Sequence, residues 1–306
     1  MNTAPFFMPR TDAPQAIVRG QHTAIASIVL NIVLAIVKIL SGLIGNSYAL
    51  VADGIESSVD ILGSAVVWGG LQIAAREPDD EFPFGYGKAE SLASLIVALL
   101  ALGAAIGIVT KSIHEIRTPH LTPAPWTLAI LIGVVAIKLL MSWRVHQVGK
   151  AIGSGAVQND ALHHLNDALT SVAAIIGVGL AVLGGPQWAP ADDWAALVAG
   201  LVIAYVGSKM MYKAIQELMD RGADAAFVEH VRSVARAVEG VLAVEKLAVR
   251  KSGLVYRVNI HIHANPAMSL HDAHALGGKV KWTIRQAEPA VQSVLVHMEP
   301  ASATAD

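Results

Sequence analysis

Six long apolar segments constrain this chain more than any other feature, because each is long enough to cross a bilayer. A spanning helix needs roughly 20 mostly apolar residues. The six segments are 22–44, 47–75, 89–114, 124–147, 156–184 and 193–217. Turn-forming residues separate them, such as the Gly-Asn-Ser run at 45–47 and the Gly-Gly-Pro run at 184–186. The sequence therefore predicts an α-helical membrane protein with six transmembrane helices.

The composition agrees with a lipid bilayer as part of the solvent. Only 15% of the 306 residues are charged, whereas soluble domains carry about 25% charged residues. A net charge of -2 provides no field that would attract nucleic acid. The chain has no cysteine, which excludes disulfides and thiolate metal sites. Any metal site must therefore be built from His, Asp, Glu and water.

Lysine and arginine are distributed unevenly among the predicted loops. They occur before the first segment, around the loop at 76–88 and between the fourth and fifth segments, whereas 45–48 and 185–193 contain none. Positively charged loops mark the cytoplasmic side of a membrane protein. We therefore expect a multi-pass protein of the cell inner membrane with both termini in the cytoplasm. Residues 1–21 lack the apolar core of a signal peptide and are predicted to form a cytoplasmic tail.

The pattern changes after residue 217, where the transmembrane domain predicted for 22–217 ends. The segment 218–306 is predicted to contain a helix at 225–239, strands at 243–250 and 254–263, a helix at 269–287 and a strand at 291–298. Apolar and polar residues alternate along 254–262, which is the period of a half-buried strand. The order α-β-β-α-β predicts a small cytoplasmic α+β domain of ferredoxin-like type.

Two of the apolar segments carry ionisable residues with the same spacing. The second segment contains Asp53, Glu56 and Asp60, and the fifth contains Asp160, His163 and Asp167. The spacing i, i+3, i+7 places each set on one face of its helix. A charge inside a spanning helix costs roughly 2.5–3.5 kcal/mol on insertion scales, and such residues are usually functional. The repeated pattern indicates two helix faces that serve one purpose.

Protonation or pairing with a basic residue is the alternative explanation for these side chains. Lys38 and Lys138 are the candidate partners within the spans, and two lysines cannot neutralise five carboxylates. A divalent cation balances the charge better. Carboxylate and imidazole ligands in a tetrahedral array suit zinc.

Depth in the membrane decides which of these residues can share one ion. The second span runs inward from the outside and the fifth runs outward, so Asp53 lies nearest the outside and Asp160 nearest the cytoplasm. The remaining four come closer to one depth, and we expect them to be the ligands: Glu56, Asp60, His163 and Asp167. Asp160 is expected to receive the ion, and Asp53 to assist its exit.

Three motifs resemble those of the cation diffusion facilitator family. Residues 52–60 (ADGIESSVD) resemble its second-helix signature, 163–167 (HHLND) its fifth-helix signature, and 84–90 (FGYGKAE) the segment that opens its third helix. The resemblance covers nearly the whole chain. It implies a homodimeric antiporter, not an enzyme, which exports Zn²⁺ or a related ion (Fe²⁺, Co²⁺, Cd²⁺ or Mn²⁺) in exchange for protons and needs no organic cofactor.

The resemblance also implies that the cytoplasmic domain holds a regulatory zinc site and that this domain serves in dimerisation. The family's ligand positions there hold His261, His274, His297, Glu299 and Glu245. Imidazole and carboxylate groups on neighbouring strands and a helix are a reasonable set of zinc ligands.

Two further expectations concern the loop at 76–88. Some family members bind metal there through an aspartate and two histidines, but this chain has Asp79 with Phe82 and Tyr86, so that site is predicted to be absent. Lys88 and Asp220 match positions that form a charge interlock at the family's dimer junction. Ordinary interfacial charges would explain this pair equally well.

Two other classes of function compete with a transporter. A membrane-anchored metal sensor would use the cytoplasmic domain alone, but an anchor does not need acidic faces on two helices. A membrane metalloprotease would need a motif such as His-Glu-x2-His, which is absent from the sequence.

Overall fold

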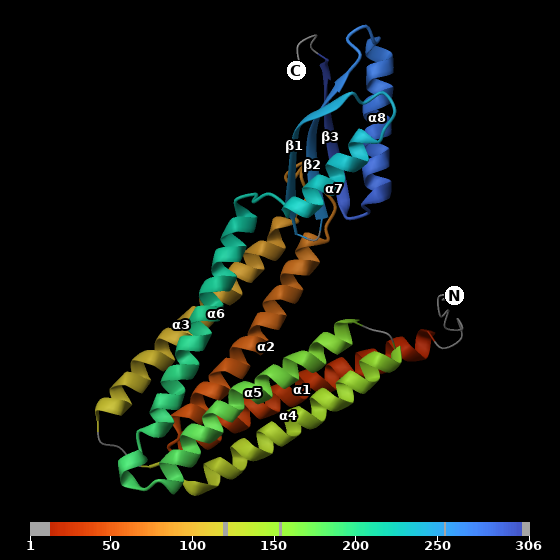
Figure 1. The fold of residues 1–306 in the computed structure, drawn as a ribbon. Helices are drawn as coiled ribbons and strands as arrows, with labels where there is room; N and C mark the ends of the chain where they lie inside the picture. Colours follow the sequence, from red (N-terminus) through yellow and green to blue (C-terminus); the bar gives the residue numbers. More distant parts are fainter. Residues whose placement is uncertain (1–12, 119–121, 153–154, 254, 302–306) are drawn as a thin grey trace, which may run out of the picture. The chain divides into compact units, whose positions relative to one another are not determined.

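The computed structural model describes residues 13–118, 122–152, 155–253 and 255–301, and the side chains of residues 13–24, 149, 151–164, 166, 169, 170 and 186 lie outside that description. Six long helices form the first part of the chain (Figure 1). They are α1 (Ala13–Ile44), α2 (Tyr48–Ala74), α3 (Lys88–Arg117), α4 (Pro125–Ile152), α5 (Gly155–Leu183) and α6 (Ala191–Leu218), with the short 3₁₀ helix η1 (Pro186–Trp188) before α6.

The six predicted spans are confirmed as helices. Within the residues that the structure describes, four of them are long and apolar enough to cross a membrane by length and composition: α1 over Ile25–Ile44, α3, α4 over Pro125–Val148, and α6. The other two, α2 and α5, are of similar length, with 27 and 29 residues, and they are the helices that carry the acidic residues. At 1.5 Å per residue they extend about 40 Å.

The cytoplasmic tail expected at 1–21 stays a prediction, and α1 begins at Ala13 and so includes residues 13–21. Pro14 does not prevent this, since proline is tolerated in the first turn of a helix. The remaining residues up to 21 include good helix formers such as Gln15, Ala16 and Arg19.

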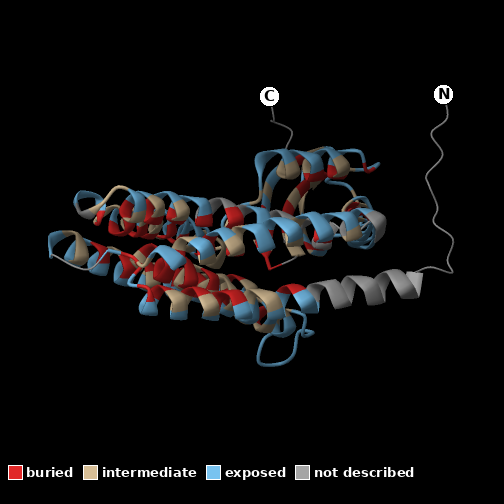
Figure 2. Ribbon diagram, turned by 90° about the horizontal axis from the view of Figure 1, so that it is seen from below, coloured by how far each residue is buried: buried red, intermediate tan, exposed pale blue. Residues whose placement is uncertain are grey.

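The helices of the first part pack through small side chains. A buried cluster joins residues of α2, α3, α4, α5 and α6, and about half of its members are alanines, for example Ala52, Ala105 and Ala196. Small residues let helix backbones approach closely where lipid removes the hydrophobic drive for association. Figure 2 shows buried residues on the sides of helices that face neighbouring helices. Large apolar side chains such as Leu43 and Trp143 are exposed, as expected for lipid-facing surfaces.

The C-terminal domain confirms the predicted order of elements. It contains α7 (Ala225–Arg236), β1 (Ala243–Ser252), β2 (Val255–Ala264), α8 (Leu270–Ala287) and β3 (Val291–Pro300). The sheet has the order β1-β2-β3, with β1 antiparallel and β3 parallel to β2. The parallel pair requires the crossover that α8 supplies.

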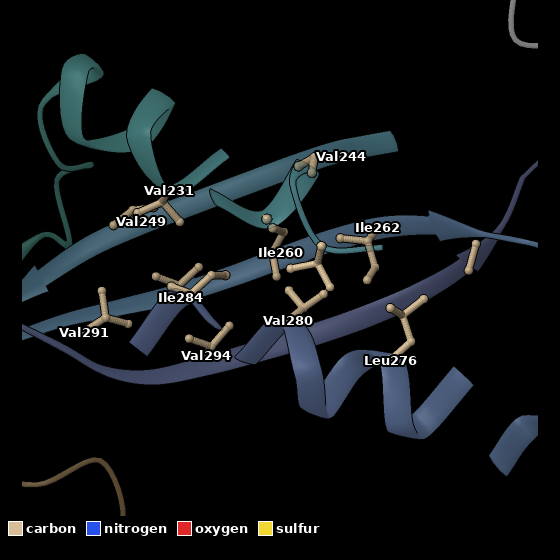
Figure 3. Packing of buried hydrophobic residues seen from close by; sticks show 14 residues of the cluster. Val231, Val244, Val249, Ile260, Ile262, Leu276, Val280, Ile284, Val291 and Val294 are labelled. Carbon is tan, nitrogen blue, oxygen red and sulfur yellow. The ribbon is translucent and has the colours of Figure 1, made fainter. Parts of the chain in front are cut away.

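The two faces of this sheet differ in character. Along β2, Val258, Ile260 and Ile262 are buried, whereas the alternate residues are more exposed. The buried side chains meet Val280 and Ile284 of α8 in the domain core (Figure 3). The opposite face is left open and polar.

The chain divides into two compact units, each described here by itself. One unit comprises Met1–Ala65 and Val97–Lys209, and the other comprises Val66–Ile96 and Met210–Asp306. The α2–α3 loop therefore groups with the C-terminal domain. Gly87 lies so close to the β1–β2 turn that a Cβ there would come within 2.6 Å of the Ser252 carbonyl oxygen. The domain boundary expected at residue 218 stays a prediction.

Ile260→Ala should destabilise the C-terminal domain. Ile260 is 1% exposed in the core, and truncating a buried isoleucine to alanine costs about 2–5 kcal/mol. Chemical denaturation of the full chain, followed by a probe in the C-terminal domain, measures this loss. Asn259→Ala on the open face of β2 is the matched control and should change stability by less than about 0.5 kcal/mol. Equal effects of the two substitutions would contradict the assignment of the faces.

Candidate metal sites

The acidic face of α2 is turned toward α5. The Ser171 hydroxyl of α5 donates a hydrogen bond to Asp53 of α2, with distances of 2.9 and 3.0 Å to the two carboxylate oxygens. Ser171 lies four residues after Asp167 and therefore continues the same row along α5. The described part of the α5 row, Asp167 and Ser171, thus lies on the face turned toward the acidic row of α2.

The two helices run antiparallel. Asp192, in the first turn of α6, accepts hydrogen bonds from the backbone N–H groups of Tyr48 and Ala49, at the start of α2. It also accepts one from the Ser47 hydroxyl, at 2.9 Å. The start of α2 therefore lies beside the start of α6, which a short connection joins to the end of α5. A carboxylate at a helix N-terminus is stabilised by the exposed N–H groups and by the helix dipole.

The antiparallel register brings the predicted transport ligands to similar depths. From the Asp53–Ser171 contact, one turn along α2 reaches Glu56, and one turn back along α5 reaches Asp167. The expectation that Asp60 and His163 share a level one turn further along stays a prediction.

Two of the predicted site residues lie only partly within the described structure. Asp160 and His163 belong to α5, but their side chains lie outside the described residues. The assignments of His163 as a ligand and of Asp160 as the receiving residue stay predictions.

Lys38 of α1 pairs with Asp53. Its ammonium group lies 2.8 Å from the Asp53 carboxylate, 3.1 Å from the Ser57 hydroxyl and 3.4 Å from the Ser171 hydroxyl. Lys38 is fully buried and Asp53 is 5% exposed. Gly54 permits this approach, since a Cβ there would come within 2.6 Å of Ile39. The cluster ties α1, α2 and α5 together, so an exit role for Asp53 would require it to leave these partners.

Lys138 of α4 pairs with Asp167, one of the predicted ligands. Lys138 is 1% exposed. The amino-acid sequence indicates both lysines as candidate partners but does not indicate which carboxylate each one pairs with. The structure supplies this pairing, because each lysine neutralises one carboxylate on a different helix. The sequence feature that pointed to these two ion pairs was a single lysine inside each of two apolar segments.

Five ionisable side chains gather on the open face of the C-terminal sheet. Two groups of three could each hold a metal ion, His261 with His297 and Glu299, and Glu245 with His263 and Glu299; within each group the ligand atoms lie within 4.8 Å of one another. The strand register explains the arrangement, because His261 pairs with His297 and His263 with Glu299 across β2 and β3.

Glu299 is shared by these two groups. Its carboxylate lies 2.6 Å from His261 Nδ1 and 3.7 Å from His263 Nε2. Hydrogen bonds that Glu245 accepts, from Glu299 above all and also from Lys246, lower its pKa to about 2, so this carboxylate is ionised at neutral pH. Nitrogen and carboxylate donors at these separations fit a zinc ion.

The structure and the sequence differ on the membership of this cluster. His263 was not among the predicted ligands, although it lies two residues from His261 on the same strand and so shares its face. His274 lies on α8, is exposed and is outside both groups. Its role as a ligand stays a prediction.

The α2–α3 loop is organised by Asp79. This carboxylate accepts hydrogen bonds from the Tyr86 hydroxyl at 2.6 Å and from the backbone N–H of Phe82 at 2.7 Å. These bonds, that from Tyr86 above all, hold the pKa of Asp79 below its usual value. The residues at the two histidine positions thus shape the loop instead of offering imidazole ligands.

Lys88 and Asp220 form the predicted ion pair within one chain, at 3.1 Å. Arg250 also pairs with Asp220. Partial burial acts to raise the pKa of Asp220, but the hydrogen bond from Lys88 and the charge of Arg250 lower it below its usual value. A role at a dimer junction stays a prediction.

Apolar helices with facing acidic rows, followed by a metal-ligand cluster on a separate domain, define an integral membrane cation transporter. Residues 24–219 match the cation efflux transmembrane domain, and residues 223–301 match the cytoplasmic domain of cation efflux proteins. The chain belongs to the cation efflux family. Members of this family are transporters, and efflux of divalent metals is their general function.

Similar proteins occur in bacteria and plants. The cation-efflux pump FieF of Citrobacter koseri is 30% identical over 92% of this chain and 93% of its own length. The manganese efflux system protein MneP of Bacillus subtilis is 26% identical over 92% of this chain and 96% of its own length. Metal tolerance protein C1 of Arabidopsis thaliana is 30% identical over 88% of this chain, which spans 60% of that longer protein.

Lys38→Met should destabilise the helix bundle. Removing one partner of a buried ion pair leaves the other charge uncompensated and costs about 3–5 kcal/mol. Thermal unfolding of the purified chain in lipid measures the loss. The double variant with Asp53→Asn removes both charges and should be more stable than Lys38→Met alone. If it is not, the described pair does not hold these helices together.

Glu299→Gln should remove most of the stabilisation that Zn²⁺ gives to the C-terminal domain. A ligand at about 100 times its Kd stabilises the folded state by about 2.7 kcal/mol, and Glu299 contributes to both ligand groups. The shift in Tm on adding Zn²⁺ is measured in a chain that also carries Asp60→Ala, which disables the transport site. His271→Ala, an exposed histidine of α8 outside both groups, should keep the full shift.

Proposed function

We propose that this protein exports divalent metal ions from the cytoplasm in exchange for protons, with Zn²⁺ as the favoured ion. The metal is the cargo, carried at a site formed by Glu56, Asp60, His163 and Asp167. The observation that carries the proposal is the contact between Asp53 and Ser171, which turns the acidic row of α2 toward that of α5. Carboxylates held in this way within apolar helices need a cation.

Proton exchange follows from the chemistry of the ligands. Carboxylate and imidazole groups must be deprotonated to bind a metal, so binding releases protons and protonation releases the metal. An imidazole titrates near neutral pH, which suits His163 to this exchange. Facing inward, the site loads metal and releases protons. Facing outward, it takes up protons and releases metal.

The donor set bears on which metal is carried. Three carboxylates and one imidazole can bind zinc in a tetrahedral array, while oxygen ligands also suit Mn²⁺. One relative is a manganese efflux protein. We place Zn²⁺ first, followed by Fe²⁺, Co²⁺, Cd²⁺ and Mn²⁺, and competition between these ions in the transport assay below ranks them.

The C-terminal domain is proposed to sense metal and to hold two chains together as a homodimer. The match to the cytoplasmic domain of cation efflux proteins supports this role, as does the ligand cluster on its open sheet face. Metal binding there would favour one arrangement of the dimer, provided that its affinity differs between the two states. In this proposal the protein lies in the cell inner membrane with both termini in the cytoplasm.

Asp60→Ala should abolish transport. Loss of a carboxylate ligand removes both charge balance and coordination, and we expect a fall of at least about 100-fold, since even indirect partners of metal ligands cost 10–100-fold. Uptake of radioactive zinc into inverted membrane vesicles with an imposed proton gradient measures the rate. Asp80→Ala, an exposed aspartate of the α2–α3 loop, is the matched control and should transport normally.

A membrane-anchored metal sensor without transport is the competing function. It predicts no uptake by the wild type above empty vesicles, together with intact Zn²⁺ binding by the C-terminal domain. Equal uptake by the wild type and Asp60→Ala would instead show that the ion does not cross at the proposed site.

A further inference from the structure

The two buried lysines of the transmembrane helices have different surroundings. Lys38 is held by three groups, the Asp53 carboxylate and the hydroxyls of Ser57 and Ser171, which is the number of protons that an ammonium group can donate. Within the described residues, the recorded partner of Lys138 is Asp167. Three partners therefore fix the ammonium group of Lys38, whereas one described partner holds that of Lys138.

Carboxylates outnumber lysines in this region. The described carboxylates are those of Asp53, Glu56, Asp60 and Asp167, and the two lysines pair with the first and the last of them. Helix α5 also carries Asp160, whose side chain lies outside the described residues. Lys138 therefore pairs with a predicted metal ligand, whereas Lys38 pairs with a residue outside the predicted ligand set.

We propose that Lys138 is a tethered cation that neutralises Asp167 while the transport site is empty and yields this carboxylate to the metal when the site is loaded. The inference rests on the proposed function and adds a residue from α4 to the site. Lys138 stays charged throughout, and its ammonium group moves off the Asp167 carboxylate when the metal binds.

A competing internal cation would serve a transporter in two ways. It lowers the affinity for the metal, and transport requires binding that is strong enough to load the ion and weak enough to release it. It also compensates the Asp167 charge in the metal-free carrier, where an unpaired buried carboxylate would be strongly unfavourable. The metal-free carrier could then return to the cytoplasmic side without an uncompensated charge at this position.

Two substitutions of Lys138 should change metal affinity in opposite directions. Lys138→Met removes the competing charge and should tighten Zn²⁺ binding by at least about tenfold, given the strength of charge repulsion at contact distance. Lys138→Arg keeps the charge and can hold the carboxylate with two hydrogen bonds, so it should weaken binding severalfold. Zn²⁺ titration of the full-length protein in lipid nanodiscs measures affinity, and the component that Asp60→Ala removes defines the transport site.

Lys150→Met is the matched control. Lys150 lies in the last turn of α4 and is exposed, so this variant loses the same charge from the same helix away from the site. Its Zn²⁺ affinity should equal that of the wild type. An increase like that of Lys138→Met would mean that net charge alone sets the affinity, and would overturn the proposal.

Transport in proteoliposomes supplies a second measurement. Exchange of zinc for zinc does not require the metal-free carrier to return, whereas net transport does. Lys138→Met should therefore lower the ratio of net transport to exchange severalfold. A purely structural role would reduce both processes together and would not tighten binding.

The outcomes separate this inference from the proposed function. A wild-type chain that performs neither exchange nor net transport defeats the proposed function. Unchanged or weaker Zn²⁺ binding by folded Lys138→Met overturns the role of Lys138. If Lys138→Met does not fold, Lys138→Arg provides the test. Zn²⁺ binding by Lys138→Arg that is as tight as that of the wild type, or tighter, would then overturn the role of Lys138.

Discussion

The hydrogen-bonded cluster of Lys38, Asp53 and Ser171 is the constraint on which the arrangement of the transmembrane site depends. A buried charge in an apolar bundle must be paired and hydrogen-bonded, and here the partners come from three different helices. Satisfying these groups fixes the rotation of α2 and α5 about their axes. The described acidic residues of both helices are then directed toward one another, because they share the faces of Asp53 and Ser171.

Lysine pairing changes how the acidic rows should be interpreted. Asp53 is fixed by Lys38 and Ser171, whereas Asp167 is paired with a lysine that has one described partner. The surroundings of Asp53 therefore hold helices together, whereas Asp167 belongs to a part of the bundle that can exchange cations. The small residues of the bundle core allow the helices to approach closely enough for such pairs.

The C-terminal metal cluster arises from strand register. The parallel alignment of β2 with β3 places His261 beside His297 and His263 beside Glu299, and the bulge in β1 near Glu245 lets that strand contribute a fifth group. The opposite face of the same sheet is covered by α7 and α8, and it supplies the apolar core that keeps the strands in register. Stability and ligand placement therefore use alternate residues of the same strands.

The amino-acid sequence determined the helices, strands and likeness to cation efflux proteins, because these follow from local periodicity, apolar length and short motifs. It also identified the acidic rows of α2 and α5, since a charge inside an apolar segment is visible without a structure. Which partner each charge takes was decided by the tertiary structure. The pairing of Lys38 with Asp53 and of Lys138 with Asp167, the contribution of Ser171 and the inclusion of His263 depend on contacts between distant segments, and neither spacing nor composition encodes the rotation and register that produce them.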